Sequence, residues 1–229
     1  MQLNDFVTGK FIRRVNRFIA EVALSDGNIV PCHLANTGRM SELLIEGRPC
    51  LLRPAKNPAR KTAWDLVMVE YHNQWVCLVA VFANQIFERW LEEKNIPYFD
   101  HCHFIKREKK IGNSRFDFYL EQDDEKWLIE IKSVNFVVNG HAKFPDAPTS
   151  RGKRHVEELL KLKEQGYHVG VVFITMGQHV RHLSFNWDSD PAFASIMAEA
   201  AQADIYMKAF SATFEPPNVI FSGERPIHY

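Results

Sequence analysis

Two neighbouring stretches, SRFDFYLEQ (114–122) and KWLIEIKSV (126–134), contain the pattern that decides the fold of the larger part of the chain. Only three residues separate them, so we expect the two stretches to pair as an antiparallel hairpin. Side chains alternate between the two faces of a strand, which places Glu130 and Lys132 on the same face. In this hairpin Asp117 can lie opposite Glu130. The sequence therefore predicts two carboxylates and one lysine close together at the surface of a sheet.

This group of charged side chains has two interpretations. Two like charges held close together need a cation, and their hard oxygen ligands favour Mg²⁺ or Mn²⁺. Such an ion would polarise a phosphoryl oxygen and lower the pKa of a bound water. Lys132 could then position that water or stabilise negative charge that develops on the phosphate. In the alternative interpretation, Asp117, Glu130 and Lys132 form only a salt bridge between strands on an exposed sheet face.

The elements expected around the hairpin favour the first interpretation. Helical spacing of apolar residues, runs with strand character and short connections predict the order α-β-β-β-α-β, which a further helix and strand complete. The acidic residues then lie on the second and third strands. The expected elements cover residues 84–95, 98–108, 114–122, 126–134, 151–165, 168–175, 190–203 and 205–214.

The first third of the chain has a different pattern, with short β-rich runs broken by turns. Five strands in about 80 residues, without a long helical period, predict a small barrel or sandwich. A five-stranded barrel of the oligonucleotide-binding (OB) type is the specific prediction. We place this domain at 1–83 and the α/β domain at 84–229. The expected strands lie in the runs 17–24, 28–35, 41–54, 66–72 and 74–82.

Composition excludes several classes of protein. The chain has 229 residues, 46% of them hydrophobic and 24% charged, as in a soluble globular protein rather than a disordered chain, a collagen or a coiled coil. No apolar run approaches the roughly 18 to 20 residues that a membrane span requires. No apolar stretch follows the charges of the first residues, so we do not expect a secretion signal. Four cysteines without a CxxC pair are typical of reduced thiols, so we expect a cytoplasmic protein. Nothing in the sequence defines an oligomeric state.

Charge is balanced overall, with 28 basic and 28 acidic residues, but it is distributed unevenly. Basic residues gather in the segments 10–17, 39–61, 106–115 and 143–154, which together favour a surface for a polyanion over chance scatter of solvated side chains. In the first segment, arginines alternate with aromatic residues and could contact phosphates and bases, although the same pattern suits an ordinary amphipathic strand. The predicted DNA contacts are Arg13, Arg14, Arg17, Arg115, Arg151, Lys153 and Arg154.

The start of the helix expected at 151–165 is a candidate phosphate site. Thr149 offers a hydroxyl cap, the first turn has free N–H groups, and three cations follow. The N-terminal end of a helix carries partial positive charge, so cations there are electrostatically unfavourable. Their presence at this position therefore favours a functional role over simple capping. His155 could serve as an additional general acid or base.

Other catalytic motifs lack support in the sequence. His101-Cys102-His103 could be half of a metal site, but no second His/Cys pair has structural-zinc spacing. The patterns GxSxG, GxxxxGK[ST] and GxGxxG are all missing.

At the level of motifs, Asp117 followed by Glu130-Ile131-Lys132 in this strand order resembles the core of the PD-(D/E)xK nuclease superfamily. Over nearly its whole length the chain also resembles the sugar fermentation stimulation protein A (SfsA) family. Small departures from the family pattern are Asn135 in place of Thr and Glu46 in place of Pro. The stretches that carry the resemblance are 9–18, 33–44, 114–118, 129–134 and 144–159.

The resemblance implies an OB-like barrel joined to a restriction-endonuclease-like domain. It also implies DNA binding without marked sequence preference and a regulatory link to sugar, notably maltose, metabolism. By the superfamily pattern, Asp117 and Glu130 would hold the metal and Lys132 would be the catalytic lysine. The pattern often adds an acid from the first helix, for which Glu88 is the candidate and Glu108 the rival.

Three functions are therefore compared. The first is Mg²⁺-dependent phosphodiester hydrolysis, which would use the intact Asp/Glu/Lys group. The second is a non-catalytic DNA-binding transcriptional regulator with a nuclease-like fold. The third is an interaction protein in which the charged strands form only a salt-bridged sheet.

Overall fold

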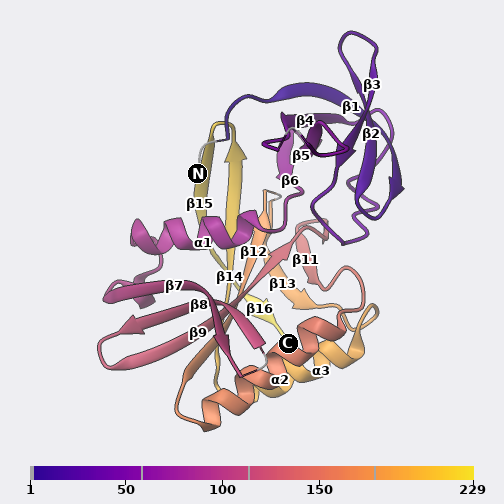
Figure 1. Cartoon of the computed structure of the whole chain (residues 1–229). Helices are drawn as coiled ribbons and strands as arrows, with labels where there is room; N and C mark the ends of the chain where they lie inside the picture. Colours follow the sequence, from indigo (N-terminus) through magenta and orange to yellow (C-terminus); the bar gives the residue numbers. More distant parts are fainter. Residues whose placement is uncertain (1–2, 58, 113, 178) are drawn as a thin grey trace.

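The N-terminal part of the chain is a closed barrel of five strands in the computed structural model, which describes residues 3–57, 59–112, 114–177 and 179–229 (Figure 1). The strand order is β3-β2-β1-β4-β5, and an additional pairing of β3 with β5 closes the barrel. Val22, Leu52 and Leu66 fill its core without any exposed surface. This architecture confirms the predicted OB-like fold. The strands are β1 (Val7–Asn16), β2 (Ile19–Leu24), β3 (Ile29–His33), β4 (Pro49–Pro54) and β5 (Trp64–Tyr71).

The strands of the barrel differ in detail from those expected. The first barrel strand is β1, where Phe11 is the one fully buried side chain and the apolar alternation is therefore weak. The run 41–54 forms a strand only from Pro49, because its first half turns around Arg48, whose Nη1 donates to the carbonyls of Glu42 and Leu43 at 2.7 and 2.9 Å. The run 74–82 gives β6 (Gln74–Cys77), which lies outside the closed ring.

The second part of the chain has the predicted order of elements. A meander of β7 (Cys102–Ile111), β8 (Ser114–Gln122) and β9 (Glu125–Val134) is antiparallel throughout. Next to it, β12 (His168–Met176) pairs in parallel with both β9 and β14 (Tyr206–Glu215). The sheet order β14-β12-β9-β8-β7 confirms the nuclease-like αβββαβ core, and β15 (Asn218–Arg225) extends it beside β14.

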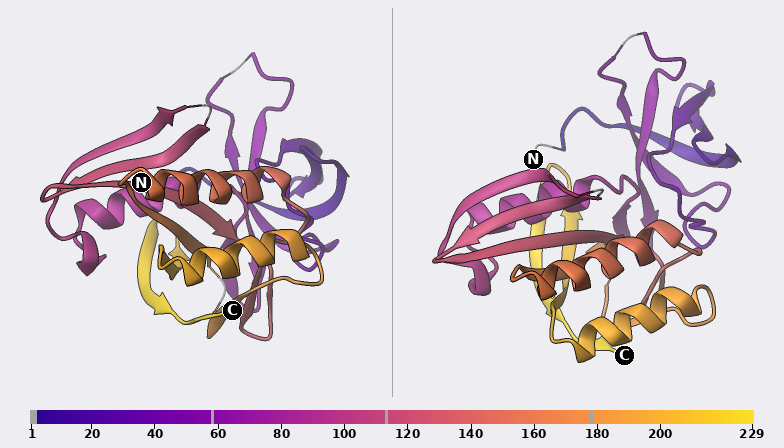
Figure 2. Two further views of the ribbon diagram at one scale, coloured as in Figure 1. Left: turned by 90° about the horizontal axis from the view of Figure 1, so that it is seen from below. Right: turned by 60° about the horizontal axis from the view of Figure 1, so that its bottom comes forward.

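Helices cover both faces of this sheet, as Figures 1 and 2 show. The helix α1 (Phe82–Glu92) packs in one hydrophobic core with Ile129 and Ile131. On the other face, α2 (Ser150–Glu164) and α3 (Pro191–Gln202) share a second core with Leu128 and Val134. Alternate residues of β9 therefore point to opposite layers, as the period of a strand requires.

Some short elements were not expected from the sequence. The run 98–108 begins with a 3₁₀ turn, η1 (Pro97–Phe99), before β7 starts. Residues 135–149, which lie between two of the expected elements, contain two strands of a second, four-stranded sheet. That sheet consists of β10 (Val137–Val138), β11 (His141–Phe144), β13 (His182–Phe185) and β16 (Ile227–His228). In the described part of the chain, no helix has the length and apolar character to cross a membrane.

The barrel and the α/β domain are joined by backbone pairing and by side chains. The short strand β6 pairs with β5 of the barrel and, through Trp75 and Phe214, with β14 of the second domain. In addition, the Asn36 amide donates to the carbonyl of Leu78 at 2.9 Å and to the Asn135 side chain at 3.2 Å. The barrel is thereby fixed to the end of β9, the strand that carries Glu130 and Lys132.

Candidate functional site

Asp117 lies where β8 and β9 separate. Regular pairing between these strands ends at Phe118 opposite Ile129, so the next position in register would place Asp117 opposite Glu130. Beyond this point the Asp117 side chain, rather than backbone pairing, connects β8 to β9. Its Oδ2 accepts a hydrogen bond from the Ile131 N–H at 2.8 Å. Its Oδ1 accepts from the Asn84 amide of α1 at 2.7 Å. Asp117 therefore joins three elements, α1, β8 and β9, at one point.

Glu130 and Lys132 lie next to this point on β9 and face α2. Both are buried, with 5% and 9% of their surface exposed. Lys132 Nζ donates to Glu130 Oε1 at 2.9 Å, and the same oxygen lies 2.6 Å from Nδ1 of His155 on α2. The second oxygen, Oε2, is buried and has no hydrogen-bond partner in the part of the chain that the structure describes. The ion pair thus lies along one strand and inside the protein, unlike the exposed bridge between strands that the alternative interpretation predicts.

The surroundings shift the pKa values of Asp117 and Glu130 in opposite directions. Burial, followed by the nearby charge of Glu130, raises the pKa of Asp117 to about 6, against the effect of its hydrogen bonds from Ile131 and Asn84. Burial alone would also raise the pKa of Glu130. The charge of Lys132 and the hydrogen bond with His155 outweigh it, so the pKa of Glu130 is lowered. Glu130 is therefore the more strongly ionised of the pair.

The chemistry of these donors fits a hard divalent cation. Carboxylate oxygens are the ligands that Mg²⁺ and Mn²⁺ prefer, and the unpartnered Oε2 of Glu130 is a buried acceptor that such an ion would satisfy. The described residues contain no cluster of three or more His, Cys, Asp or Glu side chains arranged to hold a metal. An ion here would thus take two carboxylates from the chain, and Mg²⁺ commonly keeps waters in its remaining positions.

The two candidates for a further acid are engaged by arginines. Glu88 pairs with Arg107 at 3.3 Å, and Glu108 pairs with Arg115 at 3.5 Å. From α1 it is Asn84, one helical turn before Glu88, whose side chain reaches Asp117. Sequence reasoning missed Asn84, although its spacing of four residues from Glu88 puts both on the same helix face.

The three barrel arginines have different surroundings. All five N–H groups of Arg14 donate to backbone carbonyls, at distances of 2.7 to 3.3 Å, so we assign Arg14 a structural role. The phosphate contact predicted for Arg14 would require these bonds to break. Arg13 pairs with Glu21 at 2.7 Å on the surface, and Arg17 is exposed beside the half-exposed ring of Phe18. The carbonyls that bind Arg14 belong to Asn16, Arg17, Asn36, Gly38 and Arg39.

The start of α2 has the expected cap and leads to the buried acid. Thr149 Oγ1 accepts from the Gly152 N–H at 3.0 Å. Arg151 and Arg154 are exposed, and Lys153 pairs with Glu157 at 3.5 Å. One turn further, His155 connects this helix to Glu130. The cations therefore lie on the helix that also contributes to the candidate site.

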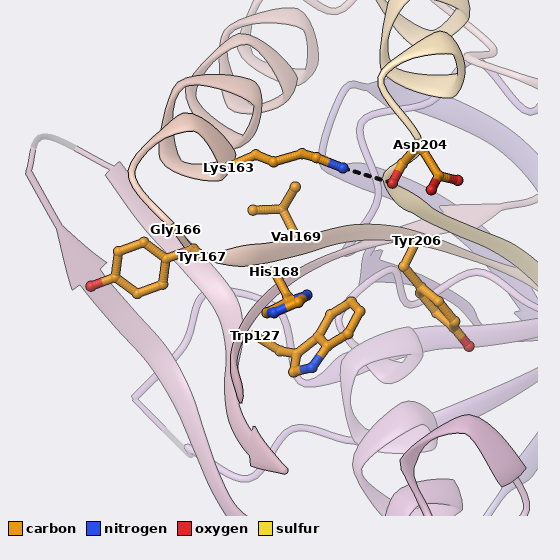
Figure 3. Close-up of a pocket in the computed structure, with 8 residues that line it drawn as sticks. All are labelled: Trp127, Lys163, Gly166, Tyr167, His168, Val169, Asp204 and Tyr206. Carbon is orange, nitrogen blue, oxygen red and sulfur yellow. Dashed lines mark hydrogen bonds between the residues drawn. The ribbon is translucent and has the colours of Figure 1, made fainter. Parts of the chain in front are cut away.

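A separate pocket of about 240 Å³ opens at the start of β12 and β14 (Figure 3). Its wall includes Trp127, His168 and Tyr206, and Lys163 closes one side through a 2.8 Å hydrogen bond to the Asp204 carbonyl. Trp127 belongs to the core on the α1 side of β9, whereas Glu130 faces α2. The pocket contains none of the predicted site residues.

A closed OB-like barrel is fixed to a nuclease-like domain in which Asp117 lies beside the buried Glu130 and Lys132. This arrangement defines a two-domain protein of the kind that the resemblance implies. Residues 12–78 match the family described as SfsA N-terminal OB domain, and residues 81–218 match the one described as Sugar fermentation stimulation protein RE domain. The chain belongs to the sugar fermentation stimulation protein (SfsA) family, which confirms the prediction made from its motifs.

Individual relatives match over almost the full chain. A sugar fermentation stimulation protein homolog of Natranaerobius thermophilus is 33% identical over 229 residues, which cover 98% of this chain and 95% of the relative. A homolog of Carboxydothermus hydrogenoformans is 38% identical over 218 residues, covering 95% and 94% of the two chains. Among solved structures, that of Pyrococcus furiosus SfsA in complex with Ca²⁺ has a TM-score of 0.93 and 30% identity, and it covers 100% of this chain and 98% of that one.

Proposed function

We propose that this protein binds DNA with little sequence preference and hydrolyses phosphodiester bonds at a Mg²⁺- or Mn²⁺-dependent site. The observation that carries the proposal is the group of buried Glu130 and Lys132 with half-buried Asp117, in which one oxygen of Glu130 has no partner among the described residues. Such a group is costly to bury, so it needs a compensating role. The structure of a family member in complex with Ca²⁺ supports a cation site in this family.

In the proposed reaction, Asp117 and Glu130 would hold the ion. When bound, the ion polarises a phosphoryl oxygen and lowers the pKa of a coordinated water. Asn84 and the Ile131 N–H orient Asp117 through both of its oxygens. Lys132, released from Glu130, would donate to the attacking water or to the phosphate and so stabilise negative charge that develops there.

For DNA, the proposed contacts are the exposed cations of the barrel and of α2. Arg13 and Arg17 on the barrel, with Arg151 and Arg154 on α2, are all exposed. Contacts to phosphates carry no sequence information, which is consistent with binding of little sequence preference. Lys153 and Arg115 are further candidates, each held by a carboxylate at 3.5 Å.

The second candidate function is a non-catalytic DNA-binding regulator of sugar use. Its support is that the described part of the chain has no cluster of three metal-binding side chains, while Lys132 already neutralises Glu130. The family description connects the chain with sugar fermentation, and this regulatory role remains part of the proposal. We also propose a cytoplasmic location, because none of the four cysteines forms a disulfide.

The test is incubation of purified protein with labelled single- and double-stranded DNA in Mg²⁺, Mn²⁺ or EDTA, with a gel shift from the same samples. We expect cleavage by the wild type only with metal, and its loss in Asp117→Asn and Lys132→Ala. Lys126→Ala, an exposed lysine of the same strand, is the matched control and should cleave normally. Retarded DNA without cleavage would favour the regulator, and DNA that is neither shifted nor cut at low salt would contradict both functions.

A further inference from the structure

We propose that His155 is a positioning residue that holds Glu130 with one oxygen engaged and the other free for a cation. The inference rests on the proposed function and assigns a role to a residue of α2 that lies 25 positions from Glu130 in sequence. It concerns the orientation of the carboxylate and requires no change in the charge of His155.

The surroundings of His155 define which ring nitrogen carries the proton. The side chain is buried, with 5% of the residue exposed, and its ring packs near Phe116. Arg151 Nε donates to His155 Nε2 at 3.4 Å, and an arginine N–H can only donate. Nε2 is therefore the acceptor, so Nδ1 carries the proton and donates to Glu130 Oε1 at 2.6 Å.

Two donors converge on the same carboxylate oxygen, and this fixes the rotamer of Glu130. Lys132 Nζ and His155 Nδ1 both bind Oε1, which leaves Oε2 as the unpartnered acceptor. The two donors differ in how freely they can move. Lys132 has a flexible stem and would have to leave Glu130 to act on a water or a phosphate, whereas His155 has a short, packed side chain on a helix. His155 would then be the group that keeps Glu130 in position while Lys132 acts.

A structural alternative must be separated from this role. His155 belongs to the buried face of α2, so its replacement could simply weaken the packing of the helix. A replacement that keeps a donor near the position of Nδ1 separates the positioning role from the packing role. Asn carries an amide N–H at that position but fills less volume than His. We therefore compare His155→Asn with two replacements that have no donor, His155→Leu and His155→Met.

The experiment is calorimetric titration of the DNA-free protein with Mn²⁺, together with thermal unfolding of each variant in EDTA. Loss of a hydrogen-bond partner of a metal ligand typically weakens metal affinity by about 10- to 100-fold, so we expect that loss in His155→Leu and His155→Met. His155→Asn should recover most of the affinity. Leu162→Ala, a buried position of the same helix away from Glu130, is the packing control and should unfold earlier but bind Mn²⁺ normally.

The outcomes separate this inference from the proposed function. If the donor-free variants bind Mn²⁺ like the wild type, or if His155→Asn is as weak as they are, the positioning role is wrong even when the wild type cleaves DNA. If the wild type binds Mn²⁺ but cuts no DNA, the proposed hydrolysis is wrong. The role of His155 is still supported in that case if the affinity for Mn²⁺ depends on a donor at position 155. His155→Met keeps the comparison available where His155→Leu does not fold, since a flexible side chain adapts to a buried site. A wild type that binds no Mn²⁺ would contradict both.

Discussion

Asp117 combines a stabilising geometry with an unfavourable charge. Its two oxygens accept hydrogen bonds from Asn84 and Ile131, yet burial and the charge of Glu130 raise its pKa to about 6, from an ordinary value of 3.8. The folded protein therefore binds a proton at Asp117 more tightly than the unfolded chain does. This contribution to stability is present at low pH and is lost as the pH rises from about 4 through about 6.

Because the pKa of Asp117 is raised, its replacement by Asn should change stability in a pH-dependent way. At pH 8 without metal, Asp117→Asn should increase the free energy of unfolding by about 1 to 3 kcal/mol, because the neutral amide removes the penalty of a buried charge. Asn84 can turn its amide and accept from the new NH₂ group. At pH 4.5 the gain should largely disappear. Urea unfolding in EDTA at both pH values measures the difference, with the exposed turn residue Asp123→Asn as the control. A variant that is less stable than the wild type at pH 8 would contradict this account.

At the same scale, the proximity of Asp117, Glu130 and Lys132 was predicted from the sequence, and two contacts of this group were not. His155 was named only as a possible acid or base. A strand hairpin determines which residues of neighbouring strands come together, so local pattern was enough for the three charged residues. Asn84 and the contact of His155 with Glu130 depend on how α1 and α2 pack on the sheet. The local sequence places Asn84 on the same helix face as Glu88, but it does not encode how the two helices pack on the sheet.

At the scale of elements, Arg14 holds the turn between β1 and β2 against the loop that follows β3. Its five N–H groups bind five carbonyls across these segments. Arginine is suited to this role because its donors lie in a rigid plane, and lysine cannot reproduce them.

We therefore predict that Arg14→Lys lowers the free energy of unfolding by about 2 to 4 kcal/mol, since several carbonyls lose a charged donor. Arg13→Lys, at the neighbouring exposed position, should change it by less than about 0.5 kcal/mol. Chemical denaturation of the two variants gives the comparison. Equal stability of Arg14→Lys and the wild type would show that the network is not needed for the fold.

A different prediction applies to the exposed cations. Arg17→Ala should weaken DNA binding about equally for all sequences. It should also reduce the slope of log affinity against log salt concentration by about 1, the value for one lost phosphate contact. Fluorescence anisotropy over a series of salt concentrations measures both. An unchanged slope would exclude Arg17 from the DNA surface.

The elements with a clear period were predicted well, and the irregular ones were not. The strands over 114–122 and 168–175 and the helix over 151–165 agree with the structure to within a residue at each end. β1 was not among the five expected strands, although an amphipathic strand was one interpretation of this segment. Its pattern is weak because one side faces water with long basic side chains and only Phe11 is fully buried. The two-residue strands β10 and β16 have no pattern of their own and form because they lie beside β11 and β13.

For the whole molecule, the central feature is the connection between barrel and site. Backbone pairing runs from the barrel through β6 into β14, and Asn36 binds the residue that follows β9, Asn135. Asn135 in turn donates to the Cys77 carbonyl at 2.7 Å. DNA held by the barrel would therefore have a fixed position relative to Glu130 and Lys132.

Asn36→Asp tests this connection, because it keeps the oxygen that accepts from Gly38 but removes the donors to Leu78 and Asn135. We expect a loss of about 1 to 3 kcal/mol in the free energy of unfolding, because the Leu78 carbonyl and the Asn135 side chain each lose this donor and face a carboxylate instead. Asn218→Asp, on the exposed end of β15, should have little effect. A thermal transition unchanged in Asn36→Asp would show that the domains are held together without this contact.

The central claim is that Asp117 and Glu130 together hold a divalent cation. The most direct measurement is anomalous scattering from crystals of the protein soaked in Mn²⁺, beside crystals of Glu130→Gln. We predict a peak within ligand distance of Asp117 and of Glu130 Oε2, and its loss in the variant. A peak bound elsewhere, or no peak at a Mn²⁺ concentration that supports DNA cleavage, would contradict the account.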